Sequence, residues 1–214
     1  KGLMRKTSEI LEIMRIFEKE NSNPQCELHF HNPYTLLVAV MLSAQSTDKG
    51  VNKATETLFK LADTPQKMLD LGLDKLKDYI KTIGLYNNKA KNIMEMSRQL
   101  VAEFGGEVPA DRDVLTTLAG VGRKTANVVM NVWYHKPTLA VDTHVMRISH
   151  RLDFSQGKTP LEVEKDLLKA LPEDLVINTN HWLVLFGRYT CKAQRPLCEN
   201  CPISAYCHCK DKRI

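Results

Sequence analysis

A short glycine turn between two helix-like segments constrains the fold of this chain more than any other feature. The turn is Gly120-Val121-Gly122, and apolar residues at helical spacing follow it directly. Glycine accepts the positive φ angles of a tight turn and permits close backbone approach. The N–H groups of such a turn point outward at the N-terminus of the next helix, where they suit an anion such as phosphate. We therefore predict two helices joined by a phosphate-binding turn.

The segment after the turn carries its apolar residues on one helical face. They are Ala126, Val129, Met130 and Trp133. Lys124 lies nearly opposite this face, on the same side as Asn127 and Asn131, so core packing does not account for it. Two interpretations remain, a solvated surface lysine or a chemically active amine one turn beyond a phosphate-type loop.

Asp142 follows eighteen residues after Lys124, just before a helix predicted to begin at Thr143. Its simplest role is to cap the N-terminus of that helix. A capping carboxylate is held rigidly, so this role is compatible with a catalytic one.

Five of the six cysteines lie in the last 24 residues. Four thiolates this close together suit a soft metal, either zinc or an iron–sulfur cluster, better than a disulfide framework. Zinc modules commonly pair two Cys-x-x-Cys knuckles, whereas only one is present here, which favours iron–sulfur. Cys209 is a spare that could replace Cys207. The four principal candidates, separated by six, two and five residues, are Cys191, Cys198, Cys201 and Cys207.

Composition and periodicity indicate a globular all-α chain. Of its 214 residues 43% are hydrophobic, yet no apolar run reaches membrane-spanning length and no stretch alternates like a strand. The formal charge of +5 is weak evidence for nucleic acid, but six Lys or Arg face two acids from Arg188 onward. We predict a final helix from Asn180 onward that ends near Cys191. One side of this helix would carry Trp182, Leu185, Phe186 and Tyr189.

Several segments resemble a known family. The hairpin Leu118-Ala119-Gly120-Val121-Gly122 and the segment Val141-Asp142-Thr143-His144 resemble the helix-hairpin-helix and Gly/Pro-Asp signature of base-excision DNA glycosylases. The spacing of the cysteines is similar to that of the bacterial endonuclease III family. Relatives usually carry proline at Ala119, and its absence loosens the turn but leaves its N–H donors. Three more segments look like that family's, in its order: Leu42-Ser43-Ala44-Gln45-Ser46-Thr47-Asp48, Ile83-Gly84-Leu85-Tyr86-Asn87 and Arg188-Tyr189-Thr190-Cys191.

The resemblance implies two helical domains with a DNA cleft between them. It places a six-helix domain with the hairpin at 26–136 and a discontinuous iron–sulfur domain at 1–25 and 137–214. It also implies a 4Fe–4S cluster on the four cysteines, acting as a structural clamp.

The activity that the resemblance implies is base-excision repair of damaged pyrimidines by a DNA glycosylase that also cleaves the abasic site. Lys124 would attack C1′ of the nucleotide and form a Schiff base that undergoes β-elimination. Asp142 would stabilise the developing oxocarbenium character and assist proton transfer.

The resemblance also implies a set of DNA contacts. Gln45 and Leu85 would enter the duplex where the target nucleotide has been flipped out. Lys192 and Arg195, in the loop between the first two cysteines, would meet phosphates. The hairpin contacts would come from Gly120, Val121, Gly122 and Arg123.

Two other functions compete with this one. An adenine glycosylase of the mismatch-repair type shares the scaffold and the cluster, but lacks a lysine at the position of Lys124. A non-catalytic iron–sulfur DNA-binding module would need neither Lys124 nor Asp142. We expect a monomer that acts on double-stranded DNA, has no membrane association and is located in the bacterial cytoplasm with the nucleoid.

Overall fold

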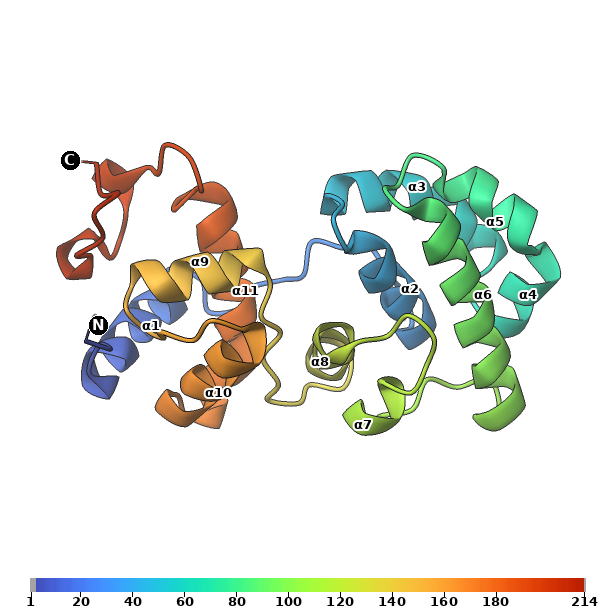
Figure 1. The fold of residues 1–214 in the computed structure, drawn as a ribbon, viewed down its shortest axis with the longest axis horizontal. Coiled ribbons are helices and arrows are strands. Elements are labelled where there is room, and N and C mark those ends of the chain that lie inside the picture. The colour runs from blue at the N-terminus through green and yellow to red at the C-terminus, as the bar shows by residue number, and fades with distance from the viewer. Residues whose placement is uncertain (1–2, 214) are drawn as a thin grey trace. The chain divides into compact units, whose positions relative to one another are not determined.

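The computed structural model describes residues 3–213, and its regular structure in that range is entirely helical (Figure 1). The predicted all-α class is therefore confirmed. None of the helices described there is a candidate for crossing a membrane, by length or by hydropathy. The chain divides into two compact units, which we call the hairpin unit (Glu27–Lys136) and the cluster unit (the described residues up to Cys26 and from Pro137 onward).

The hairpin unit is built around α2 (Pro33–Ser43), whose residues from Tyr34 to Leu42 are all buried. Such a helix has no solvent face, and α3, α6 and α8 all pack against it. Its start is fixed by Asn32, whose side chain accepts from the Thr35 N–H at 2.7 Å in a reciprocal capping box. The surrounding helices are α3 (Asp48–Leu61), α4 (Pro65–Leu71), α5 (Leu73–Ile80), α6 (Tyr86–Glu103), α7 (Arg112–Leu115) and α8 (Arg123–Val132).

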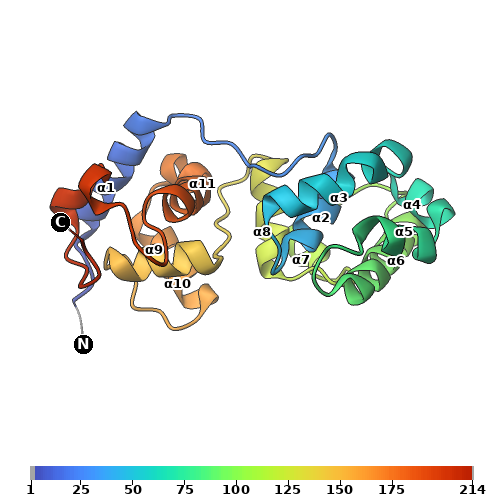
Figure 2. The same ribbon diagram turned by 90° about the horizontal axis from the view of Figure 1, so that it is seen from above.

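Helix α6 is the longest helix in the hairpin unit and packs against several of the others. It packs against α2, α4 and α5 (Figure 2). Its buried face includes Ile93, Met96 and Leu100, which recur at helical spacing. The turn that carries Leu85 immediately precedes this helix.

The cluster unit has a single apolar core to which all four of its α-helices contribute. Helix α11 packs against α1 and α9, and α10 packs against α1 and α9. Phe17 and Phe186 meet edge to face, with ring centroids 4.9 Å apart. The elements are α1 (Thr7–Glu20), α9 (Thr143–Arg151), α10 (Pro160–Ala170), α11 (Glu173–Tyr189) and the short 3-10 helices η1 (Cys198–Asn200) and η2 (Ser204–Tyr206).

The final α-helix differs from the prediction in its first residue and in the exposure of one side chain on the predicted apolar side. Helix α11 begins at Glu173, seven residues before the predicted Asn180. Leu175 and Val176 continue its buried face, and the acidic first turn after Pro172 suits a helix N-terminus. Trp182 and Phe186 are buried as expected, but Tyr189 is exposed because it lies at the last residue of the helix, beyond the core.

Candidate functional site

The glycine turn has the geometry of a tight hairpin at one of its two glycines. Gly120 has φ +72°, and a Cβ there would lie 2.7 Å from Cβ of Asn92 on α6, so both conformation and space require glycine. Gly122 has φ −94° and is the N-cap of α8, so the expectation of positive φ does not extend to it. The Ala119 N–H donates to Oε1 of Gln99 at 2.8 Å, a bond that proline at this position could not make.

Lys124 is the second residue of α8, and its side chain is exposed. The apolar face of the helix is buried through Ala126, Val129 and Met130, as predicted. Trp133, predicted on the same face, is the C-cap of the helix and only half-buried. Asn127 and Asn131, which share the side of Lys124, are buried as well. No side chain caps the N-terminus of α8, so its positive end is available to an external anion.

Asp142 caps α9 as predicted. Its Oδ1 accepts from the Val145 N–H at 2.8 Å, and its Oδ2 lies 3.0 Å from Nδ1 of His144. Both carboxylate oxygens are therefore held, one by the helix and one by the imidazole. A carboxylate fixed in this way keeps its direction without reorganisation, which suits electrostatic stabilisation of a nearby positive charge.

Gln45 and Leu85 both lie on exposed turns of the hairpin unit. Each has a left-handed backbone, with φ 57° and 60° respectively. Leu85 is 62% exposed, an unusual position for a large apolar side chain at the head of a helix. Nothing within this unit accounts for that exposure.

The four predicted cluster ligands line one cavity in the cluster unit, beside α11, η1 and η2. Cys209 does not line this cavity, and its Sγ instead accepts from the Asp211 N–H at 3.4 Å. Within residues 3–213 no three metal-binding side chains converge on a single ion. A cluster assigns each thiolate to a different iron, so its ligands need not converge on one point. The other lining residues are mostly apolar: Leu152, Phe186, Thr190, Pro196, Leu197, Ile203, Ser204 and Lys212.

The thiols of this cavity need positive charge to ionise. Burial raises the pKa of both Cys191 and Cys201, and the Arg151 guanidinium, 3.3 Å from Sγ of Cys191, opposes the rise at that residue. Metal ions supply the remaining positive charge when they bind thiolates. The donor set and its partly buried, apolar setting therefore fit an iron–sulfur cluster.

A basic cavity of about 550 Å³ adjoins the loop between Cys191 and Cys198, which we call the cluster loop. Arg195 lines it, as do the tail residues Lys210, Lys212 and Arg213, against a single acid, Asp211. Lys192 is exposed on the same loop. The sequence analysis counted the tail cations in the C-terminal charge excess but named only Lys192 and Arg195 as DNA contacts.

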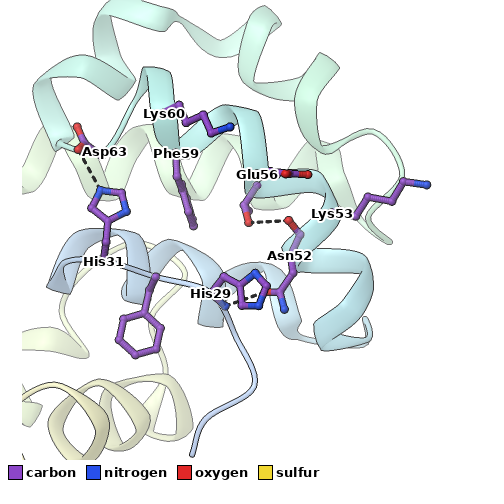
Figure 3. Close-up of a pocket in the computed structure, with 10 residues that line it drawn as sticks. His29, His31, Asn52, Lys53, Glu56, Phe59, Lys60 and Asp63 are labelled. Carbon is purple, nitrogen blue, oxygen red and sulfur yellow. Dashed lines mark hydrogen bonds and ion pairs between the residues drawn. The ribbon is translucent and has the colours of Figure 1, made fainter.

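The hairpin unit has an open pocket of about 670 Å³ (Figure 3). On one side it is lined by the segment that precedes α2, and on the other side by α3. His31 Nε2 lies 3.0 Å from Oδ2 of Asp63, and Lys67 Nζ lies 3.2 Å from Oδ1. These contacts, His31 first, hold the pKa of Asp63 below its ordinary value. None of the predicted site residues lines this pocket.

Sequence reasoning missed three basic residues that support the predicted sites. Arg147 and Arg151, one turn apart on α9, donate to backbone carbonyls at and after the end of α11, including that of Cys191. Lys89 on α6 donates to carbonyls beside Gln45. The spacing of the two arginines on one helix face was a visible signal, whereas the buried course of the Lys89 side chain was not.

Two family comparisons match the chain. Residues 38–173 match the HhH-GPD superfamily of base excision DNA repair proteins. Residues 191–207 match the iron–sulfur binding domain of endonuclease III, so the C-terminal segment carries the 4Fe–4S cluster that the cysteine spacing indicated.

Individual proteins agree with this assignment over nearly the whole length. Endonuclease III of Haemophilus influenzae is 53% identical, over 98% of this chain and 99% of its own. That of Escherichia coli K12 is 50% identical, over 94% and 96%. A trapped endonuclease III–DNA covalent intermediate superposes with a TM-score of 0.91 at 46% identity, over 96% of this chain and 97% of that one. A non-covalent endonuclease III–DNA complex gives 0.92 at 44% identity, over 97% of each. With the hairpin, the helix-capping aspartate and the cysteine cavity in place, this chain belongs to the endonuclease III family and is a base-excision DNA glycosylase and abasic-site lyase.

Proposed function

We propose that this enzyme removes damaged pyrimidines and cleaves the resulting abasic site through a Schiff base on Lys124. The observation that carries the proposal is the position of Lys124, exposed on the first turn of α8 directly after the hairpin. The side chain has no packing role there. It projects from a helix end that is ready to receive a phosphate, so a bound strand would bring its sugars near the amine.

In the first step the neutral amine of Lys124 attacks C1′ of the damaged nucleotide, and the C1′–N bond to the base breaks. The leaving base takes the bonding electron pair and a proton. Asp142 stabilises the positive charge that develops on the sugar and accepts the proton that the amine loses. The capping bond to Val145 and the contact with His144 keep that carboxylate fixed during the change.

In the second step the C1′–O4′ bond of the sugar ring breaks as the lysine nitrogen forms a C1′=N imine, and O4′ takes up the proton that Asp142 accepted. The imine then activates the sugar for elimination. Loss of a C2′ proton forms a C1′–C2′ enamine, and its electron pair expels the 3′ phosphate as the C3′–O bond breaks. Water then releases the sugar fragment and restores the amine. Lysine suits this sequence because its primary amine forms imines reversibly.

We assign DNA contacts to both units. In the hairpin unit the backbone of Gly120 to Arg123 receives a phosphate, and Gln45 and Leu85 fill the space left by the flipped nucleotide. The exposure of Leu85 supports this role, because an apolar side chain gains by entering a base stack. In the cluster unit Lys192 and Arg195 contact phosphates, and the basic cavity beside Arg195 supports that assignment.

The four cysteines at 191, 198, 201 and 207 hold the cluster, which ties the cluster loop to the C-terminal segment that follows it. We infer that the hairpin unit serves as the six-helix domain and the cluster unit as the iron–sulfur domain, with Cys26 on the cluster side of the boundary instead of the predicted hairpin side. We further infer that the protein works as a monomer on nucleoid DNA in the cytoplasm.

Borohydride trapping on a duplex with an abasic site tests the nucleophile. The natural protein should become covalently attached to DNA, and Lys124→Ala should neither attach nor cut while still binding the duplex. Lys75→Ala, an exposed lysine on α5, serves as the matched control. Cutting by Lys124→Ala at a near-normal rate would refute the assignment. Release of an oxidised pyrimidine but not of a mispaired adenine tests the substrate class.

A further inference from the structure

Lys89 is a buried lysine whose ammonium is enclosed by backbone. The residue is 8% exposed and lies on the first turn of α6. Its Nζ donates to the carbonyls of Leu42 at 3.0 Å and Ala44 at 2.5 Å, with the hydroxyl of Ser46 at 3.4 Å. An ammonium has three donors, and these acceptors employ all of them.

Each acceptor belongs to the end of α2 or to the turn after it. The last carbonyls of a helix have no partner within the helix, and a glycine after the C-cap commonly lets the backbone satisfy them. Here Ala44 is the C-cap and Gln45 follows it, so the Lys89 side chain takes that role from another helix. No carboxylate in the described part of the chain pairs with Lys89, and burial alone lowers the pKa of its amine.

Two strained turns meet at this point. Gln45 and Leu85 both have left-handed backbones, which L-residues adopt only when their surroundings impose them. The turns lie close together, because a Cβ at Gly84 would be 3.9 Å from the carbonyl oxygen of Gln45. Both carry exposed side chains, so the packing of those side chains does not hold them in place.

Lys89 touches both turns. Its backbone N–H donates to the carbonyl of Leu85 at 3.1 Å, and its side chain reaches the carbonyl of Ala44 directly before Gln45. We propose that Lys89 is a positioning residue that fixes the Gln45 turn relative to the Leu85 turn, so that both side chains enter the damaged duplex together.

This inference rests on the proposed entry of Gln45 and Leu85 into DNA. If the Gln45 and Leu85 side chains enter the duplex at one site, the distance between them must be fixed, because the space left by the flipped nucleotide has a fixed size. Without the Lys89 side chain, the carbonyls at the end of α2 lose their hydrogen-bond donor. The Gln45 turn can then move relative to α6. Recognition of the lesion should weaken, while phosphate contacts to any duplex should remain.

The test compares the affinities of the full-length holoenzyme for a duplex with a tetrahydrofuran abasic analogue and for the same undamaged duplex. Lys89→Met should lower the ratio of the two affinities about tenfold, equivalent to about 1.4 kcal/mol, with little change for undamaged DNA. A 2-aminopurine opposite the analogue should lose its fluorescence rise. Lys91→Met, the same change at an exposed lysine of α6, should alter neither quantity.

A double-mutant cycle separates positioning from general stability. In a Gln45→Ala/Leu85→Ala background, Lys89→Met should have less than about a twofold further effect on the ratio. An undiminished, additive effect would overturn the positioning role, as would a normal ratio in Lys89→Met alone. If Gln45→Ala/Leu85→Ala itself leaves the ratio unchanged, the proposed DNA contacts fail first and this inference falls with them.

Lys89→Arg covers the case in which the methionine variant does not fold. It retains a buried cation, but a planar guanidinium cannot meet three acceptors arranged around one ammonium. An intermediate loss of lesion preference, with thermal stability near normal, supports positioning. A normal ratio of the two affinities in Lys89→Arg, although the 2-aminopurine fluorescence no longer rises as in the natural protein, would contradict the positioning role.

Discussion

Arg151→Met should speed the loss of the cluster by freeing the cluster loop from α9. The Arg151 guanidinium donates to the carbonyls of Lys192 at 2.7 Å and Ala193 at 3.0 Å. It also lies 3.3 Å from both the carbonyl oxygen and Sγ of Cys191. Methionine keeps much of the apolar stem and removes every one of these donors.

The size of the effect follows from the two short bonds. A hydrogen bond to a charged group contributes about 1.5–3 kcal/mol net. Lys192 and Ala193 are exposed, so water can replace the guanidinium and the lower figure applies, about 3 kcal/mol for the pair. The ion pair with Asp211, 3.5 Å away and largely exposed on the Asp211 side, adds little. A loss of about 3 kcal/mol raises the population of the open loop roughly 100-fold.

The assay follows the visible absorbance of the holoenzyme after addition of an iron chelator, under conditions in which loop opening precedes iron release. Arg151→Met should lose its absorbance roughly 100-fold faster than the natural protein. Arg15→Met is the control, since Arg15 is exposed on α1 of the same unit and pairs with Glu18 and Asp174. An acceleration below about threefold, under 1 kcal/mol, would show that Arg151 does not hold the loop.

Three further predictions concern the cluster unit. Cys207→Ser should lose its iron and Cys209→Ser should keep about four irons per chain on iron analysis of anaerobically prepared protein; the reverse would reassign the fourth ligand. Replacing Lys192 and Arg195 together by Ala should flatten the log–log salt dependence of DNA binding by about two units, for damaged and undamaged duplexes alike, and an unchanged slope with the cluster present would contradict the phosphate contacts. Burial lowers the pKa of His181 below its ordinary 6.5, so the unfolded chain takes up the proton first as pH falls. As the pH falls below 6.5, the free energy of unfolding should therefore decrease by up to about 1.4 kcal/mol per pH unit. Urea titrations at several pH values should show a weaker dependence of this free energy on pH in His181→Gln.

Local signals predicted those parts of the fold that depend on neighbouring residues. Asp142 was predicted as an N-cap because an aspartate stood directly before a helical pattern, and its bond to the Val145 N–H confirms this. The start of α11 was predicted wrongly, although Pro172 and two acids marked it, and residues 178–180 carry polar side chains that do not favour a helix interior. In the structure Thr179 is buried and its hydroxyl bonds the Leu175 carbonyl, so tertiary packing overrides that propensity.

Interactions between distant segments could not be predicted from periodicity. Lys89 belongs to a charged stretch that reads as solvent-exposed, and only the approach of the end of α2 makes it a buried donor. Asn127 and Asn131 were placed with Lys124 on a polar side, yet both are buried. Helical spacing fixes which residues share a side but not what lies against it.

A single helix supports each feature of the hairpin unit to which we assign a DNA contact. The N-terminus of α6 carries Leu85 and, through Lys89, the turn of Gln45. One turn further, Asn92 lies against Gly120 so closely that no side chain fits between them. Two turns beyond that, Gln99 accepts from the Ala119 N–H and approaches the Thr117 carbonyl. Because these contacts lie on one rigid element, the duplex-entering turns and the phosphate-binding turn keep a fixed relation, and DNA held by one is presented to the other.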